Sequence, residues 1–110
     1  YVHIKGPDEF GHDGDALGKK QNIEKIDSEF FGTLLRELRI TNVVIVVSGD
    51  HSTPCIKKSH TDDPVPLLIS SKTLKNTRVQ RFTESYAKTG ALGSIMGSDV
   101  LDKTLEIIPL

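Results

Sequence analysis

An α/β fold with a mostly parallel sheet is predicted for this chain of 110 residues from three features of its apolar pattern. A short apolar stretch opens the chain at 1–5, a stretch of helical periodicity spans 18–38, and β-branched residues dominate 43–48. A strand, a helix of this length and a buried strand make a βαβ unit, whose crossover is normally right-handed. The length allows one compact domain with an ordinary core.

The first third of the chain is predicted to contain a strand, a loop and one amphipathic helix. The strand, Tyr1–Lys5, is broken by Gly6-Pro7, and residues 6–17 are rich in Gly and Asp, which indicates a loop. From residue 18 onward, apolar side chains recur in steps of three and four, at positions 23, 26, 30, 34 and 38. This is the period of one face of a helix. Gly32 should weaken that helix by roughly 1 kcal/mol relative to Ala.

The remaining chain is predicted to hold two strands, a long polar loop and a last helix. The elements follow in order: a strand at Val43–Ser48, a polar loop at 49–63, a strand at Val65–Ile69, a turn at 70–76 and an ambiguous stretch at 81–97. The continuous β-branched run of the first of these strands fits burial on both faces, as in a parallel sheet covered by helices. Ser98 is the predicted N-cap of a helix through Ile107, which Pro109 ends.

Composition argues against several classes of protein. The formal net charge is −1, which gives no electrostatic basis for binding nucleic acid or a membrane surface. The longest apolar run, Val43–Val47, is far too short to span a bilayer, and no signal peptide is visible. The single Cys55 excludes an internal disulfide framework and favours a reducing compartment. The chain starts with Tyr1 inside a predicted strand, which suggests a piece of a longer protein.

Three of the four histidines lie in short polar stretches rich in Gly, Pro, Asp or Ser. The first two stretches follow predicted strands, and the third leads into the strand at Val65–Ile69. Because ligands of an open α/β sheet bind beyond the carboxyl ends of its strands, we expect these histidines to meet at one edge of the sheet. The pattern predicts a two-metal phosphotransfer site, or half of one.

Each candidate ligand also has a simpler structural explanation. Asp8 and His12 suit Mn²⁺, Zn²⁺ or Fe²⁺ better than Ca²⁺, but Asp8 could instead cap a turn beside an exposed His12. Asp50 could N-cap the turn that follows it, with His51 solvated, and His60 alone resembles any polar loop histidine. Together these clusters are uncommon by chance. The best partition gives one metal to Asp8, His12 and His60 and a second to Asp50 and His51, whose set is incomplete.

The remaining candidate residues give weaker evidence of a functional role. His3, inside the first predicted strand, is interpreted as a packed or capping histidine, with a supporting role behind a metal ligand as the alternative. Asp13 and Asp15 are expected at a helix entry, stabilised by the positive end of the helix, and one of them could instead support a metal ligand. Cys55 lacks the identifiable base that a catalytic cysteine needs, and Ser48 and Ser52 lack the Gly-x-Ser-x-Gly turn of a serine hydrolase.

Three motifs together resemble the cofactor-independent phosphoglycerate mutases of the archaeal type, which belong to the alkaline phosphatase superfamily. They are the segments Pro7–Asp15, Gly49–Cys55 and Ser59–Pro66, and the resemblance extends to Gly90–Gly93. It implies a three-layer α/β/α fold with a mostly parallel sheet. It also implies interconversion of 3-phosphoglycerate and 2-phosphoglycerate in glycolysis and gluconeogenesis, through a phosphoserine and with two divalent metals. Mn²⁺ is expected first, with Zn²⁺, Mg²⁺ or Co²⁺ as alternatives.

Mapped by motif, the resemblance assigns Asp8, His12 and His60 to one metal and Asp50 and His51 to the other. It implies that residues 1–110 are the C-terminal part of the metal-binding domain. The nucleophilic serine, a further aspartate ligand and most substrate-binding residues would then lie upstream, so the chain alone is expected to be inactive.

The expected partners are a small phosphorylated substrate and the remainder of the same enzyme, in the cytoplasm, with no nucleic acid or membrane. The oligomeric state stays open. One alternative is another reaction of the same superfamily, such as that of a phosphopentomutase, phosphatase, phosphonate hydrolase or sulfatase. The other is a non-catalytic metal-binding α/β module.

Overall fold

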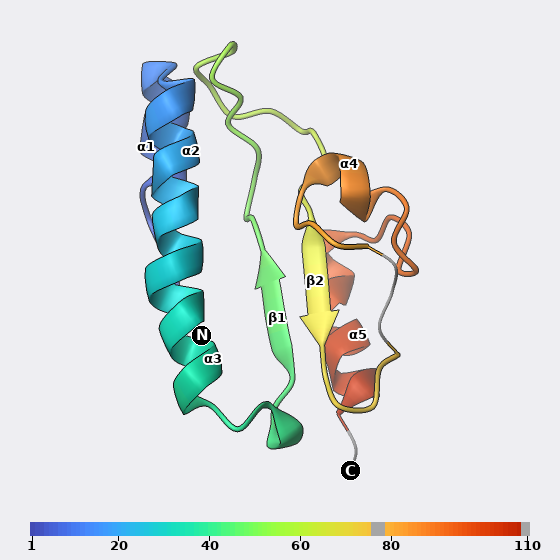
Figure 1. The fold of residues 1–110 in the computed structure, drawn as a ribbon. Coiled ribbons are helices and arrows are strands. Elements are labelled where there is room, and N and C mark those ends of the chain that lie inside the picture. Colours follow the sequence, from blue (N-terminus) through green and yellow to red (C-terminus); the bar gives the residue numbers. More distant parts are fainter. Residues whose placement is uncertain (76–78, 109–110) are drawn as a thin grey trace. The chain divides into compact units, whose positions relative to one another are not determined.

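The computed structural model describes residues 1–75 and 79–108, which form two compact units (Figure 1). We call the first the ligand unit; it comprises Tyr1–Leu38 and Asp50–Pro64. The second, the strand unit, comprises Arg39–Gly49 and Val65–Leu110. All five predicted metal ligands lie in the ligand unit. Within the described ranges, no helix has the length and apolar character needed to cross a membrane.

The ligand unit contains a helix where the sequence predicts a loop. This helix, α1, spans Pro7–Asp13. Proline stands at its start, Asp8 and Glu9 occupy its first turn, and Gly14 follows its last turn in the left-handed conformation, with φ 76°. These are ordinary helix start and stop signals. The prediction of a loop over 6–17 is therefore wrong for most of this stretch, because its Gly, Pro and Asp residues mark the helix ends.

The predicted strand at Tyr1–Lys5 is not formed, since these residues have no regular secondary structure. A strand must pair its backbone groups with a neighbouring strand, and the described residues offer this segment no such neighbour. The predicted βαβ unit is therefore absent from this part of the chain.

The predicted helix over 18–38 is confirmed as three consecutive helical segments. They are α2, Ala16–Lys25; the π-helical η1, Ile26–Phe31; and α3, Gly32–Glu37. Asp15 caps the start of α2, where its Oδ1 accepts a hydrogen bond from the Gly18 amide at 2.8 Å, as expected for a helix-entry residue. α2 packs against α1, and the three segments follow one another along one rod (Figure 1).

The two later strands are confirmed, with a different pairing from the predicted parallel sheet. β1, Ile45–Ser48, pairs antiparallel with β2, Leu67–Ser70, so that Ser48 lies opposite Leu67. Exposure alternates along both strands, which is typical of an antiparallel pair with one better covered face. The prediction that 43–48 is buried on both faces is therefore wrong. This small antiparallel sheet is the one sheet among the described residues, and they show no three-layer parallel sheet.

The described part of the strand unit also contains four short helical elements. They are η2, Ile40–Asn42; α4, Glu84–Ala87, within the stretch left ambiguous; η3, Gly97–Asp99; and α5, Val100–Ile107. The predicted last helix is confirmed, but Ser98 is not its N-cap. Residue 98 lies in a 3₁₀ turn, and its hydroxyl donates to the Asp99 carboxylate at 3.1 Å. The predicted end at Pro109 lies outside the described residues.

Burial is greatest in the ligand unit. No apolar side chain among the described residues is buried. The residues that are buried there are Gly6, Gly11 and Thr53, and the Thr53 side chain is the buried polar one, at 4% exposure. The most enclosed point of the described chain is thus a polar contact between α1 and the loop that carries Thr53.

Candidate metal centre

α1 places Asp8 and His12 on one helix face. Residues four apart in a helix are neighbours on its surface, and the Asp8 Oδ1 lies 3.5 Å from the His12 Nε2. The helix brings the two side chains together directly, without the sheet edge that the sequence analysis invoked. The predicted pairing is therefore found, with a different structural cause.

The loop Asp50–Pro64 delivers the other histidines. Its two arms are held together by an isolated antiparallel bridge between Ser52 and Thr61, whose amide donates to the Ser52 carbonyl at 3.0 Å. Between the arms, the Pro54 carbonyl accepts from the amides of Lys57 and Lys58. The bend places His60 with its Nε2 at 3.3 Å from the Asp8 Oδ1.

Asp8, His12 and His60 form a group able to hold a metal ion. One ligand atom from each lies within 4.8 Å of the other two. Two ligands at about 2.1 Å from one ion lie about 3.4 Å apart in tetrahedral geometry, close to the observed 3.3 and 3.5 Å. The side chains are 45%, 45% and 53% exposed, so an ion there would remain open to further ligands. The donor set of one carboxylate and two imidazoles fits a divalent transition metal.

The second predicted set lies beside the first but is less complete. The His51 Nε2 is 3.7 Å from the Asp50 Oδ2, and the His51 amide donates to the Asp50 Oδ1 at 3.1 Å. The His51 and His60 ring centroids lie 3.8 Å apart, with the ring planes tilted by 32°. These two residues alone supply too few ligands for a closed shell, as the sequence analysis predicts.

Thr53 connects the two sets. Its hydroxyl donates to the Asp8 Oδ1 at 2.6 Å and lies 3.2 Å from the His51 Nδ1. The hydrogen bond from Thr53 is the main cause that lowers the pKa of the Asp8 carboxyl below its usual value. The nearby imidazoles of His12, His60 and His51 act in the same direction, and partial desolvation opposes them. Asp8 is therefore an acceptor near neutral pH.

The hydrogen bond of His12 assigns its tautomer. The His12 Nδ1 lies 3.1 Å from the Lys58 carbonyl oxygen. A carbonyl oxygen can only accept, so Nδ1 carries a proton, and in the neutral ring Nε2 then keeps its lone pair. That Nε2 faces Asp8. The loop thus favours the tautomer in which Nε2 can bind a metal.

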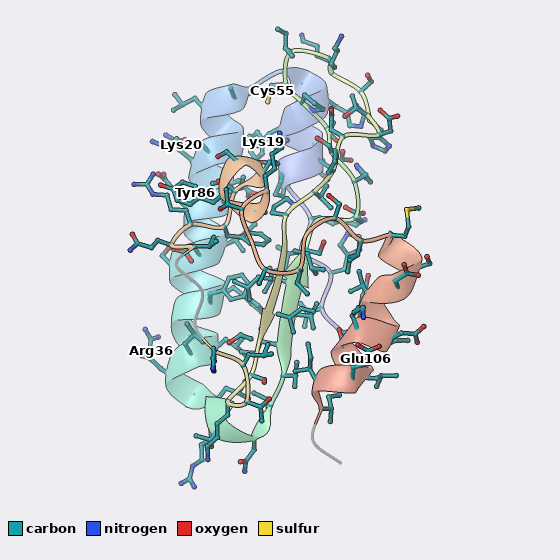
Figure 2. All side chains as sticks on the ribbon, turned by 90° about the vertical axis from the view of Figure 1, so that its right-hand side faces the viewer. Lys19, Lys20, Arg36, Cys55, Tyr86 and Glu106 are labelled. Carbon is teal, nitrogen blue, oxygen red and sulfur yellow. The ribbon has the colours of Figure 1, made fainter. Side chains whose placement is uncertain are left out.

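Sequence reasoning misses Thr53, Lys19 and the carbonyl of Lys58 as parts of this centre. The Lys19 ammonium donates to the Thr53 carbonyl at 2.8 Å. Figure 2 shows Lys19 directed from α2 toward the loop, with Cys55 on the loop itself. Cys55 contacts the Phe10 carbonyl through its thiol. A loop threonine or a helix lysine shows no signal in one sequence, because its partners lie 34 to 45 residues away.

The converging ligands on α1 and the loop Asp50–Pro64 define a candidate metal-binding protein. Over residues 1–106 the chain matches the family model described as the Metalloenzyme superfamily. The chain belongs to this superfamily, which includes the alkaline phosphatase type of fold expected from the resemblance.

Named relatives agree with the resemblance. The 2,3-bisphosphoglycerate-independent phosphoglycerate mutase of Aeropyrum pernix is 41% identical over 98% of this chain. The protein of that name, numbered 1, from Archaeoglobus fulgidus is 40% identical over 97% of it. The solved structure of the PH0037 protein from Pyrococcus horikoshii superposes with a TM-score of 0.91 at 38% identity, covering 96% of this chain and 32% of that one. The chain spans about a quarter (26%) of the length of the two mutases.

Proposed function

We propose that this chain supplies the metal-binding part of a phosphoglycerate mutase that interconverts 3-phosphoglycerate and 2-phosphoglycerate without a bisphosphoglycerate cofactor. The observation that carries the proposal is the convergence of Asp8, His12 and His60 in a chain about 40% identical to proteins named as such mutases. Because the chain spans only 26% of those relatives, activity, substrate and partners belong to the proposal. So does its assignment to the C-terminal part of the enzyme.

The distances support a proposal of two ligand sets. Asp8, His12 and His60 would hold one divalent ion, and Asp50 with His51 would contribute to a second. The second ion needs further ligands from residues outside this chain. Mn²⁺ is the proposed metal because the family resemblance implies it, and Zn²⁺, Mg²⁺ and Co²⁺ are the alternatives; the donor set by itself does not choose among them.

The chemistry of a bound metal pair would be to neutralise the charge on a transferring phosphoryl group and to activate a hydroxyl. The residues of this chain would hold the ions and orient the ligand atoms. Asp8 presents an ionised carboxylate oxygen, and His12 presents Nε2 because its Nδ1 donates to the Lys58 carbonyl. The nucleophilic serine of the proposed phosphoserine route lies outside this chain. The expected cytoplasmic location goes with this proposal.

Replacement of single histidines in the intact protein tests the proposal. We expect His12→Ala and His60→Ala each to abolish mutase activity and to lower the bound metal content. The matched control is His3→Ala, which removes the fourth histidine, an exposed side chain outside the cluster. Metal content is measured by elemental analysis and activity by conversion of 3-phosphoglycerate. Full activity and metal content in His60→Ala would overturn the assignment.

A related phosphotransfer reaction is the second candidate, because the matching family model describes metal-binding enzymes and no single substrate. A panel of phosphoglycerate, pentose phosphates, phosphonates and sulfate esters, assayed on the intact protein, separates these reactions. A non-catalytic metal-binding module would bind the ions and turn over none of these substrates.

A further inference from the structure

Thr53 occupies the most constrained position of the ligand unit. Thr53 is 4% exposed, whereas the nearby side chains of Asp8, His12 and His60 are about half exposed. The Lys19 ammonium holds its carbonyl at 2.8 Å. On the other side, a Cβ added at Gly11 of α1 would clash with that carbonyl and lie 2.9 Å from the Thr53 Cγ2. The helices α1 and α2 therefore constrain this threonine from two directions.

The single proton of the Thr53 hydroxyl determines the tautomer of His51. The hydroxyl has one hydrogen to donate, and the ionised Asp8 can only accept, so the proton goes to the Asp8 Oδ1 at 2.6 Å. The contact with the His51 Nδ1 at 3.2 Å must then run the other way, with the imidazole N–H donating to the hydroxyl oxygen. His51 thus carries its proton on Nδ1 and keeps a lone pair on Nε2, which lies near the Asp50 carboxylate.

We propose that Thr53 is the positioning residue that joins the two ligand sets, orienting the Asp8 carboxylate of one and fixing the tautomer of His51 in the other. The inference rests on the proposed metal centre and deepens it. The tautomer of a ligating histidine is set by the hydrogen bond of its other nitrogen. Hydrogen-bond partners of this kind change metal affinity by about 10- to 100-fold when they are removed.

Removal of the Thr53 hydroxyl would take a hydrogen-bond partner from each of the two ligand sets. The Asp8 oxygen loses its shortest donor, and the His51 Nδ1 loses the acceptor that holds its proton. A valine at position 53 has nearly the same shape and no hydroxyl, whereas a serine keeps the hydroxyl and loses a methyl group. The two substitutions therefore separate hydrogen bonding from packing.

The test compares Thr53→Val and Thr53→Ser in the intact protein, with Thr33→Val on α3 as the matched control. Titration calorimetry measures the Kd for Mn²⁺, and the visible absorption of the Co²⁺-loaded protein reports the ligand geometry. We expect Thr53→Val to raise the Kd about 10- to 100-fold and to alter the Co²⁺ spectrum. Thr53→Ser should stay within about threefold of wild type, and Thr33→Val should equal it.

A second measurement needs neither metal nor the valine variant. In metal-free wild-type protein at a pH where imidazoles are neutral, the ¹⁵N resonances of His51 should show the Nδ1–H tautomer. The Nε2–H tautomer would overturn the inference even if Thr53→Val failed to fold. Unchanged Kd and spectrum in a folded Thr53→Val variant would overturn it as well. A wild-type protein that binds no Mn²⁺ or Co²⁺ would instead overturn the proposed metal centre, a distinguishable result.

Discussion

The ligand unit and the strand unit differ in the contacts within each of them. In the ligand unit, hydrogen bonds from distant residues meet on one buried threonine, and the candidate metal ligands surround it. In the strand unit, no residue whose burial is described is buried, and apolar side chains such as Leu101 remain 66% exposed. The polar centre is specified within these residues, whereas apolar packing of the strands and α5 is not completed by them.

The largest effect is expected from Asp8→Asn. The Asp8 Oδ1 lies within 3.5 Å of two imidazole nitrogens and one hydroxyl, so the charge of this carboxylate is central to the ligand unit. We expect the affinity for Mn²⁺ to fall at least about 100-fold, since a neutral amide replaces an anionic ligand. Calorimetry on the intact protein measures this. Asp13→Asn, at the exposed end of the same helix, should bind as wild type does; equal losses in both would contradict the special role of Asp8.

Gly11→Ala should disrupt the contact between α1 and the loop. Alanine normally favours a helix interior by about 1 kcal/mol over glycine, but here the added Cβ would meet the Thr53 backbone. Overpacking of this kind costs about 1–3 kcal/mol, and backbone has little freedom to yield. Urea unfolding should therefore show destabilisation. Gly32→Ala is the matched control, because its Cβ would meet one atom at 3.8 Å and should stabilise the helix.

The Asp8–Thr53 hydrogen bond should make stability depend on acid pH. The pKa of Asp8 is lowered in the folded protein, so the folded state binds this proton more weakly than the unfolded state. The resulting stabilisation is complete above the unfolded-state pKa of about 4 and is lost as pH falls through the folded-state pKa. The free energy of unfolding of metal-free wild type and of Asp8→Asn, measured from pH 3 to 7, should converge at the acid end. A difference that widens toward acid pH would contradict the sign.

Much of the fold is predictable from the sequence where the pattern is local. The apolar period over 18–38 gives the long helix, and β-branched runs give both strands. The failures have non-local causes: Tyr1–Lys5 has no strand to pair with among the described residues, and the strands pair antiparallel. The helix at Pro7–Asp13 is a different failure, because its signals are local and present in the sequence. A proline at the start and a glycine just after the end mark a short helix between them.

The ligands themselves are predictable because aspartate and histidine are chemically distinctive at motif spacing. The structure brings Asp8, His12 and His60 together as predicted; their binding of metal stays a prediction. Thr53 is not predictable in the same way, because a threonine in a loop gives no sign of its partner 45 residues away. Its role depends on where α1 and the loop meet, and that contact needs the three-dimensional arrangement.

Lys19→Met should weaken the ligand unit by a smaller amount. Its ammonium donates to the Thr53 carbonyl at 2.8 Å in a half-buried position, so we expect a loss of about 1 kcal/mol and a few-fold weaker binding of Mn²⁺. Lys20→Met is the matched control, since this lysine points away from the loop (Figure 2) and forms an ion pair with the exposed Glu24 at 3.4 Å. That pair should contribute about 0.5 kcal/mol or less. Equal effects on metal affinity would show that Lys19 does not position the loop.

The smallest effect is expected in the strand unit, from Leu101→Gln on α5. This side chain is 66% exposed, and substitutions at such positions usually change stability by less than about 0.5 kcal/mol. Because no described contact links Leu101 to the ligands, Mn²⁺ affinity should be unchanged. Urea unfolding and calorimetry on the 110-residue chain measure both quantities, and the same substitution in the intact protein provides the second arm.

A loss of stability confined to the intact protein would show that additional residues cover this face of α5. A large loss in the 110-residue chain would mean that α5 packs within it, and the contrast between the two units would then fail.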